Sequence, residues 1–132
     1  MPDFSAVPAT IGEYRALRGL CGLTVFTEAA VAIGLANTLH GVWLREEGRL
    51  VGMGRLIGDG GCFALVCDIA VDPDFRRQGW GGAIVTRLMA WGDAHLPEKC
   101  FVSLIADPGA EPLYERAGFD YYTGMARFTS PH

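Results

Sequence analysis

Lysine and basic clusters are scarce in this sequence. Only one of its 11 basic residues is a lysine, Lys99, and the formal net charge is −4. The sole pair of adjacent basic residues is Arg76 and Arg77, whereas surfaces that bind nucleic acid carry many basic side chains. Charged residues make up 20% and hydrophobic residues 50% of the chain, a balance typical of folded domains. We therefore expect no nucleic-acid partner.

Long hydrophobic runs are also missing. No stretch approaches the roughly twenty apolar residues that span a bilayer. The N-terminal segment MPDFSAVPAT lacks the basic and then apolar order of a signal peptide. A chain of 132 residues has the ordinary length of one domain and can bury a core without disulfides or metal. We expect a single domain over residues 1–132, no membrane association and a cytoplasmic location.

The few cysteines and histidines form none of the usual metal or redox motifs. No C-x-x-C pair occurs, and neither G-x-S-x-G nor H-E-x-x-H is present. These patterns disfavour zinc hydrolases and serine hydrolases, and we expect no metal. We interpret the cysteines as small buried hydrophobic residues, namely Cys21, Cys62, Cys67 and Cys100.

Hydrophobic periodicity and capping residues predict helices in the N-terminal part. In residues 10–20, TIGEYRALRGL, Thr10 is a natural N-cap and Glu13 stands at the capping-box position. A second helix is expected in residues 27–39, with Thr27 as its N-cap. Three apolar runs then alternate with the turn sequences EEGR and GDGG. They predict an antiparallel meander of three strands near residues 41–46, 50–57 and 62–72.

The remainder of the chain predicts a crossover and further strands. Helical spacing begins at Gly79 or Gly81 and is stopped by Pro97. We expect a strand over residues 100–106, a short helix within 106–119 and a last strand over 119–128. The sequence therefore predicts an α+β fold, with a strand, crossover helix and parallel-type strand at its centre.

The loop before the crossover helix has features of an anion site. The segment DFRRQGWGGAIV, residues 74–85, combines two arginines with three glycines where a strand gives way to a helix. Unpaired backbone N–H groups and the positive end of the helix dipole favour an anion at such a point. Two common phosphate loops are absent, since neither G-x-G-x-x-G nor G-K-[ST] is matched. The alternative is a tight glycine turn with solvated arginines.

Two motifs in this region resemble one superfamily. VDPDFRRQGWGGAIVTRLM resembles the acetyl-CoA-binding motif of the GNAT N-acetyltransferases, whose core [QR]-x-x-G-x-[GA] runs here from Arg76 to Gly81. PLYERAGF, residues 112–119, resembles the second signature of the same superfamily. The resemblance implies a mixed, mainly antiparallel, twisted sheet flanked by helices, with a splayed central strand pair.

The resemblance also implies the residues that bind acetyl-CoA. The loop would bind the pyrophosphate through backbone amides, with charge from the arginines, and the main chain of the preceding strand would pair with the pantetheine arm. Many relatives have an asparagine after the fifth strand, where this chain has Asp107 and Glu111. The implied cofactor-binding residues are Ile69, Ala70, Val71, Arg76, Arg77, Gln78, Gly79, Trp80, Gly81 and Gly82.

The implied reaction is direct attack of a neutral primary amine on the thioester. By resemblance, Tyr114 lies within reach of the sulfur and is the general acid that protonates the departing thiolate. Asp68, on the third strand of the meander, is the first candidate for a general base. An acid at this position could equally fix a loop or bind a cationic amine.

Alternative functions stay open at this point. A sensor that binds acyl-CoA without turnover would share the fold, because fold does not determine function. A protein–protein interaction module would bind no cofactor at all. For an enzyme, the acceptor would be an amine on a small molecule or a peptide. The apolar and aromatic segment FDYYTGMARF, over residues 119–128, suggests a homodimer.

Overall fold

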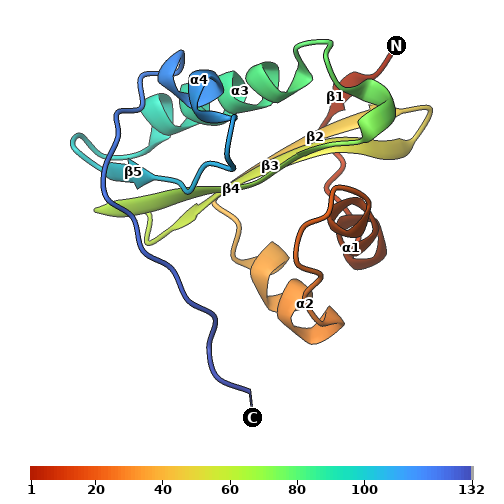
Figure 1. Ribbon diagram of the computed structural model, residues 1–132, viewed down its shortest axis with the longest axis horizontal. Coiled ribbons are helices and arrows are strands. Elements are labelled where there is room, and N and C mark those ends of the chain that lie inside the picture. Colours follow the sequence, from red (N-terminus) through yellow and green to blue (C-terminus); the bar gives the residue numbers. More distant parts are fainter. Residues whose placement is uncertain (132) are drawn as a thin grey trace.

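A computed structural model describes residues 1–131, which form a sheet covered by helices (Figure 1). The strands are β1 (Asp3–Ser5), β2 (His40–Glu46), β3 (Arg49–Gly58), β4 (Phe63–Val71) and β5 (Phe101–Ser103). The α-helices are α1 (Ile11–Leu20), α2 (Glu28–Ala36), α3 (Trp80–His95) and α4 (Glu111–Glu115), and the 3-10 turn η1 covers Pro73–Phe75. Within the described residues no helix is long and apolar enough to cross a membrane.

The five strands lie in the order β1-β2-β3-β4-β5. Neighbours are antiparallel except β4 and β5, which run parallel and are joined through α3. The predicted α+β class, with a mainly antiparallel sheet flanked by helices, is confirmed. The predicted meander agrees with β2, β3 and β4 to within two residues at each end.

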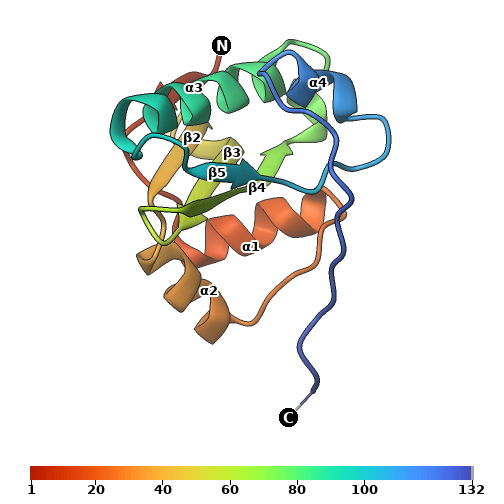
Figure 2. The ribbon, with the colours of Figure 1, turned by 90° about the vertical axis from the view of Figure 1, so that its left-hand side faces the viewer.

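Helices cover both faces of the sheet. Figures 1 and 2 show α1 and α2 on one face, and α3 and α4 on the other. Strand alternation supplies a core to each face, since Trp43 packs with the α1 side and its neighbour Val42 with the α3 side. One core lies on each face of the sheet, and together they fix the position of the sheet relative to the helices.

Local sequence explains the ends and seating of the main helices. Thr10 caps α1, and its side chain accepts a bond from the Glu13 amide while Glu13 accepts one from the Thr10 amide, as predicted. The helix α3 lies close to β3 because residue 54 is glycine. A Cβ there would come within 2.6 Å of Ile84 and 2.7 Å of Ile69.

The structure differs from the sequence-based predictions at several points. The short strand β1 was not expected, α2 ends at Ala36 rather than near residue 39, and β5 covers only three residues of the expected 100–106. The predicted last strand over residues 119–128 is wrong, because these residues form no strand and pair with none in the described chain. A strand needs the hydrogen bonds of a neighbour, and composition alone does not supply one.

The interpretation of the cysteines also needs correction. Cys62 is exposed in the turn before β4, whereas Cys21, Cys67 and Cys100 are partly buried and all four thiols are free. Cys62 lies in the glycine-rich turn that Asp59 closes by accepting bonds from the amides of residues 61–63. A turn of this kind keeps its side chains in solvent, so the hydrophobic character of cysteine does not decide its burial here.

Candidate active site

A β-bulge in β4 carries the buried Asp68. Met53 pairs with Ala70 and Arg55 pairs with Cys67, so Gly54 faces both Asp68 and Ile69. Such a bulge bends the strand and turns one side chain out of its regular direction. Asp68 itself has a φ of 60°, in the left-handed region that few non-glycine residues adopt. The bend starts where β4 turns away from β5.

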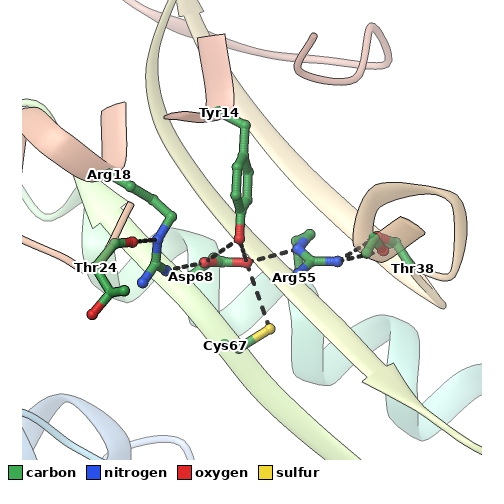
Figure 3. Close-up of polar contacts among 8 residues, drawn as sticks. Tyr14, Arg18, Thr24, Thr38, Arg55, Cys67 and Asp68 are labelled. Carbon is green, nitrogen blue, oxygen red and sulfur yellow. Dashed lines mark hydrogen bonds and ion pairs between the residues drawn. The ribbon is translucent and has the colours of Figure 1, made fainter. Parts of the chain in front are cut away.

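The Asp68 carboxylate is surrounded by donors from α1 and β3 (Figure 3). Tyr14 of α1 donates its hydroxyl to both oxygens at 2.8 Å, and Arg55 of β3 donates Nε at 2.7 Å. Arg18 of α1 forms a further ion pair with the same carboxylate. The side chains of Asp68, Arg18 and Arg55 are 3%, 11% and 9% exposed. The carboxylate is therefore bound on both oxygens and largely removed from solvent.

The two arginines extend this cluster to the α1–α2 side. Arg55 donates Nη1 to the Gly34 carbonyl and the Thr38 hydroxyl, each at 2.8 Å, and Arg18 donates Nε to the Thr24 carbonyl at 2.6 Å. Charge-assisted bonds of this kind are short and directional. The cluster therefore ties α1, the end of α2, β3 and the bulge of β4 together.

The cluster changes the acidity of two neighbouring groups. Burial, with the negative charge of Asp68, raises the pKa of the Tyr14 hydroxyl to about 12. Burial, again with Asp68, raises the pKa of the Cys67 thiol to about 12. Both groups keep their protons near neutral pH. Because the thiolate is the nucleophilic form of cysteine, Cys67 is poorly suited to form a covalent intermediate.

The strands β4 and β5 separate just before this bulge. Their pairing covers Phe63 with Phe101, Ala64 with Val102 and Leu65 with Ser103, and it ends there while β4 continues to Val71. A small pocket of about 110 Å³ opens at the divergence. It is lined by Arg18, Leu23, Val66, Cys67, Asp68, Ile69, Ile105, Asp107 and Tyr114. A larger hollow of about 380 Å³ lies beside Pro97, at the other end of α3 from the glycine loop.

Tyr114 enters the pocket from α4. The residue is 9% exposed, and its ring packs edge-on against Phe119 with 6.2 Å between centroids. Burial, with the charge of Asp107, raises the pKa of the Tyr114 hydroxyl above its usual value near 10. Within residues 1–131 no buried side-chain oxygen lacks a hydrogen bond, and the Tyr114 hydroxyl has no hydrogen-bond partner there, so this hydroxyl is accessible to solvent on a residue that lines the pocket.

The glycine loop lies at the N-terminus of α3. Gly79 is the N-cap with a φ of 85°, Arg77 has a φ of 62°, and the space where a Gly79 Cβ would stand is open to 4 Å. Among the residues that the structure describes, no acceptor is bound by the backbone N–H groups of residues 77–82. A run of free amides at a helix N-terminus is a ready anion site.

Leu113 links this loop to the pocket. A Cβ on Gly82 would lie 3.3 Å from Leu113 Cδ1, and one on Gly81 would lie 3.7 Å from Leu113 Cδ2. The residue next to Leu113 is Tyr114, whose side chain lines the pocket. The short helix α4 therefore holds the candidate acid beside the candidate anion loop.

The predicted site residues lie partly in the pocket and partly at the glycine loop. Asp68, Ile69 and Tyr114 line the pocket, whereas residues 76–79 form the glycine loop and residues 80–82 begin α3. Ala70 is instead buried in the core on the α1 side, so only its main chain could serve a ligand. Both arginines are exposed, but Arg76 donates Nε to the Val71 carbonyl at 3.0 Å and so lies toward β4.

Sequence reasoning missed the partners of Asp68. Tyr14, Arg18 and Arg55 lie 54, 50 and 13 residues away along the chain. Each belongs to an ordinary helix or strand pattern, and no local motif marks them. The sequence had singled out Asp107 for its position after the fifth strand. Asp68 and Asp107 both line the pocket, and of these two carboxylates Asp107 has no ion pair within the described chain.

Relatives of known sequence share this chain's motifs. The family model described as an acetyltransferase (GNAT) domain matches residues 38–121. The Arabidopsis thaliana protein named GCN5-related N-acetyltransferase 1, chloroplastic, is 31% identical over 69% of this chain and 46% of the relative. The Oryza sativa subsp. japonica protein named serotonin N-acetyltransferase 2, chloroplastic, is 34% identical over 67% of this chain and 48% of the relative. The chain thus spans about half the length of these curated relatives.

Solved structures agree with the family match. A Staphylococcus aureus protein of unknown function, described as a probable acetyltransferase, has a TM-score of 0.91 and 36% identity, covering 98% of this chain and 100% of its own. A Trypanosoma brucei acetyltransferase shares the fold, with a TM-score of 0.74 and 19% identity over 98% of this chain and all of the other. With the glycine loop, the diverging strands and the family match together, the chain belongs to the GNAT acetyltransferase family.

Proposed function

We propose that the protein transfers the acetyl group of acetyl-CoA to a primary amine by direct attack. The observation that carries this proposal is the position of α4, which packs Leu113 on the glycine loop and presents Tyr114 to the pocket between β4 and β5. Members of this family use acetyl-CoA and amine acceptors. The candidate anion loop suits the phosphates of acetyl-CoA, and the protonated Tyr114 hydroxyl suits the thiolate that departs when an amine attacks. The described residues fit acetyl-CoA as a co-substrate, and we propose no metal.

The loop and β4 would hold the two parts of coenzyme A. The free amides of Gln78 to Gly82 suit the pyrophosphate, and Arg77 adds an exposed charge beside them. Beyond Leu65, β4 has no strand on its β5 side, so the main chain of Ile69, Ala70 and Val71 could pair with an extended ligand there, apart from the Val71 carbonyl, which already accepts bonds from Arg76 and Cys21. Arg76 would support this segment through its bond to the Val71 carbonyl.

The chemical step needs few groups. The amine nitrogen attacks the thioester carbonyl carbon, the C–S bond breaks, and the thiolate takes a proton from the Tyr114 hydroxyl. The proton that the nitrogen loses passes to solvent, which returns a proton to the Tyr114 oxygen. Aligning two reactants can itself be worth about 7–11 kcal/mol. The raised pKa of the Cys67 thiol agrees with a reaction without an acyl-enzyme.

The two pocket carboxylates would have different roles. Asp68 as general base stays a prediction, but its oxygens already accept bonds from Tyr14, Arg18 and Arg55. We propose that it positions the bulge rather than taking the proton. Asp107 has no ion pair among residues 1–131 and lines the same pocket, so it is better placed to attract a cationic amine.

Turnover separates this proposal from its alternatives. We expect thiol release from acetyl-CoA when the protein meets a panel of primary amines, including small amines and peptides with free N-termini. Tight binding of acetyl-CoA with no release from any amine would favour a silent sensor, and no binding would favour an interaction module. The cytoplasmic location stays a prediction. The amine that releases thiol from acetyl-CoA in this panel identifies the acceptor.

The anion loop can be tested by reversing the charge of Arg77. Arg77→Glu should weaken acetyl-CoA binding by roughly ten- to a hundred-fold, since a charge-assisted bond is worth about 1.5–3 kcal/mol. The matched control is Lys99→Glu, which makes the same charge change at another exposed position of positive φ, at the far end of α3. Calorimetry should show near-normal affinity in the control. Equal losses in both variants would point to net charge rather than to the loop.

A further inference from the structure

The buried cluster around Asp68 contains one more positive charge than negative charges. Arg18 and Arg55 both bind the Asp68 carboxylate, and the side chains of all three are largely buried. Tyr14 and Cys67 also contact this carboxylate, but burial raises the pKa of each to about 12, so both are neutral. Among residues 1–131 no second carboxylate pairs with either arginine. Because buried charges are normally paired, the cluster lacks one negative partner.

Arg18 is the arginine of this cluster that reaches the pocket between β4 and β5. Its Nε donates to the Thr24 carbonyl, and its Nη1 binds Asp68. The guanidinium carbon lies 4.7 Å from the centroid of the Phe26 ring, which holds the group in place. The remaining nitrogen, Nη2, has no acceptor within residues 1–131 (Figure 3). Since no buried side-chain nitrogen of the described chain lacks a partner, this Nη2 is accessible to solvent on a residue that lines the pocket.

A carboxylate lines the same pocket from another direction. Asp107 has no ion pair with Arg18 or with any other cation of the described chain. Burial and the charge of Asp107 raise the pKa of the Tyr114 hydroxyl, so Asp107 lies close to the proposed acid. Arg18 belongs to α1, whereas Asp107 lies in the segment that leads into α4, and Figures 1 and 2 show these two helices on opposite faces of the sheet. The pocket therefore has a cationic group from the α1 side and an anionic group from the α4 side.

We propose that the acceptor is a small amino acid, a molecule that carries a primary amine and a free carboxylate. This inference rests on the proposed function. The carboxylate of the acceptor binds Nη2 of Arg18 and supplies the negative charge that the cluster lacks. Asp107 holds the amine beside Tyr114, and the amine attacks the thioester as in the proposed transfer. A pocket of about 110 Å³ suits a small molecule, and a peptide, whose amine and carboxylate are far apart, would not make both contacts.

Matched acceptors test this inference on the unaltered protein. Glycine, β-alanine and γ-aminobutyrate each have an alkylamine partner in which a methyl group replaces the carboxylate, namely ethylamine, propylamine and butylamine. From thiol release, kcat/KM should be roughly ten- to a hundred-fold higher for at least one amino acid than for its partner, the gain from one charge-assisted contact. Alkylamines that match or exceed all three amino acids would overturn the inference and leave the proposed function standing. No thiol release with any amine would overturn both.

The variant Arg18→Gln assigns the preference to this residue. It should bring kcat/KM for the preferred amino acid close to that of its alkylamine partner, whereas a merely structural loss would lower both alike. The control Arg15→Gln removes an arginine of the same helix that donates to the Phe26 carbonyl at 2.8 Å and does not line the pocket, so the ratio should stay at the wild-type value. If Arg18→Gln does not fold, Arg18→Lys keeps the charge, loses the forked nitrogen and should likewise lower the ratio. An unchanged ratio in the folded variant would overturn the assignment.

The variant Asp107→Asn should give a different pattern from Arg18→Gln. Amino acids and alkylamines share the amine, so losing the carboxylate that holds it should lower kcat/KM for both and leave their ratio unchanged. A ratio that falls as it does in Arg18→Gln would show that Asp107 does not hold the amine, and it would overturn this arrangement of the acceptor.

Discussion

Tyr114→Phe should lower the turnover number by roughly ten- to a thousand-fold while leaving acetyl-CoA affinity close to that of the wild type. The substitution keeps the buried ring and its packing against Phe119, and it removes only the hydroxyl of this pocket-lining residue. A departing thiolate then has no positioned proton donor, and water must supply the proton. Steady-state rates with saturating amine, together with calorimetric affinity, measure the two effects separately.

The pH dependence of the rate adds a second observation. An acid catalyst works in its protonated form, and burial with the charge of Asp107 raises the pKa of Tyr114 above its usual value near 10. We therefore expect no loss of rate from Tyr114 below about pH 10. The control is Tyr121→Phe, which removes a hydroxyl bonded to the exposed Glu115 at 2.8 Å and should leave turnover unchanged. Wild-type rates in Tyr114→Phe, where chemistry limits turnover, would mean that solvent is the acid.

Asp68→Asn should destabilise the fold by about 3–5 kcal/mol, the usual cost of removing one partner from a buried ion pair. Its carboxylate neutralises Arg18 and Arg55, which are almost as buried as Asp68 itself. An asparagine offers one acceptor oxygen, and its NH₂ group would face guanidinium donors. Chemical denaturation should show a lower midpoint with a similar slope. The control Asp93→Asn, at an exposed position on α3, should change stability by less than about 0.5 kcal/mol.

A milder variant keeps the role of Asp68 testable if Asp68→Asn does not fold. Tyr14→Phe removes one of the donors and leaves both ion pairs, and it should cost about 1.5–3 kcal/mol, the value of a bond to a charged group. A positioning role predicts that activity falls together with stability in these variants. A stable Asp68→Asn protein with turnover lost and acetyl-CoA binding retained would instead identify Asp68 as the base.

Local sequence determined much of the fold and the glycine loop of the candidate site. The capping box at Thr10 and Glu13, the turns around Asp59 and the glycines from residue 79 each act over a few residues, so their structures follow from neighbours in the chain. The same holds for the candidate anion loop, because free amides at a helix N-terminus are a local property. The signature around Tyr114 pointed to this residue from the sequence, and the structure places it among the residues that line the pocket.

Only the tertiary structure decided how Asp68 is used and where the chain's last residues go. The donors to Asp68 come from residues 14, 18 and 55, and a bulge opposite Gly54 turns the carboxylate toward them, which no local pattern encodes. Residues 119–128 have the composition of a strand, yet they form none, because strand formation requires a second strand at hydrogen-bonding distance. Composition determines what a segment can pair with, and the arrangement of the other elements determines whether that partner is within reach.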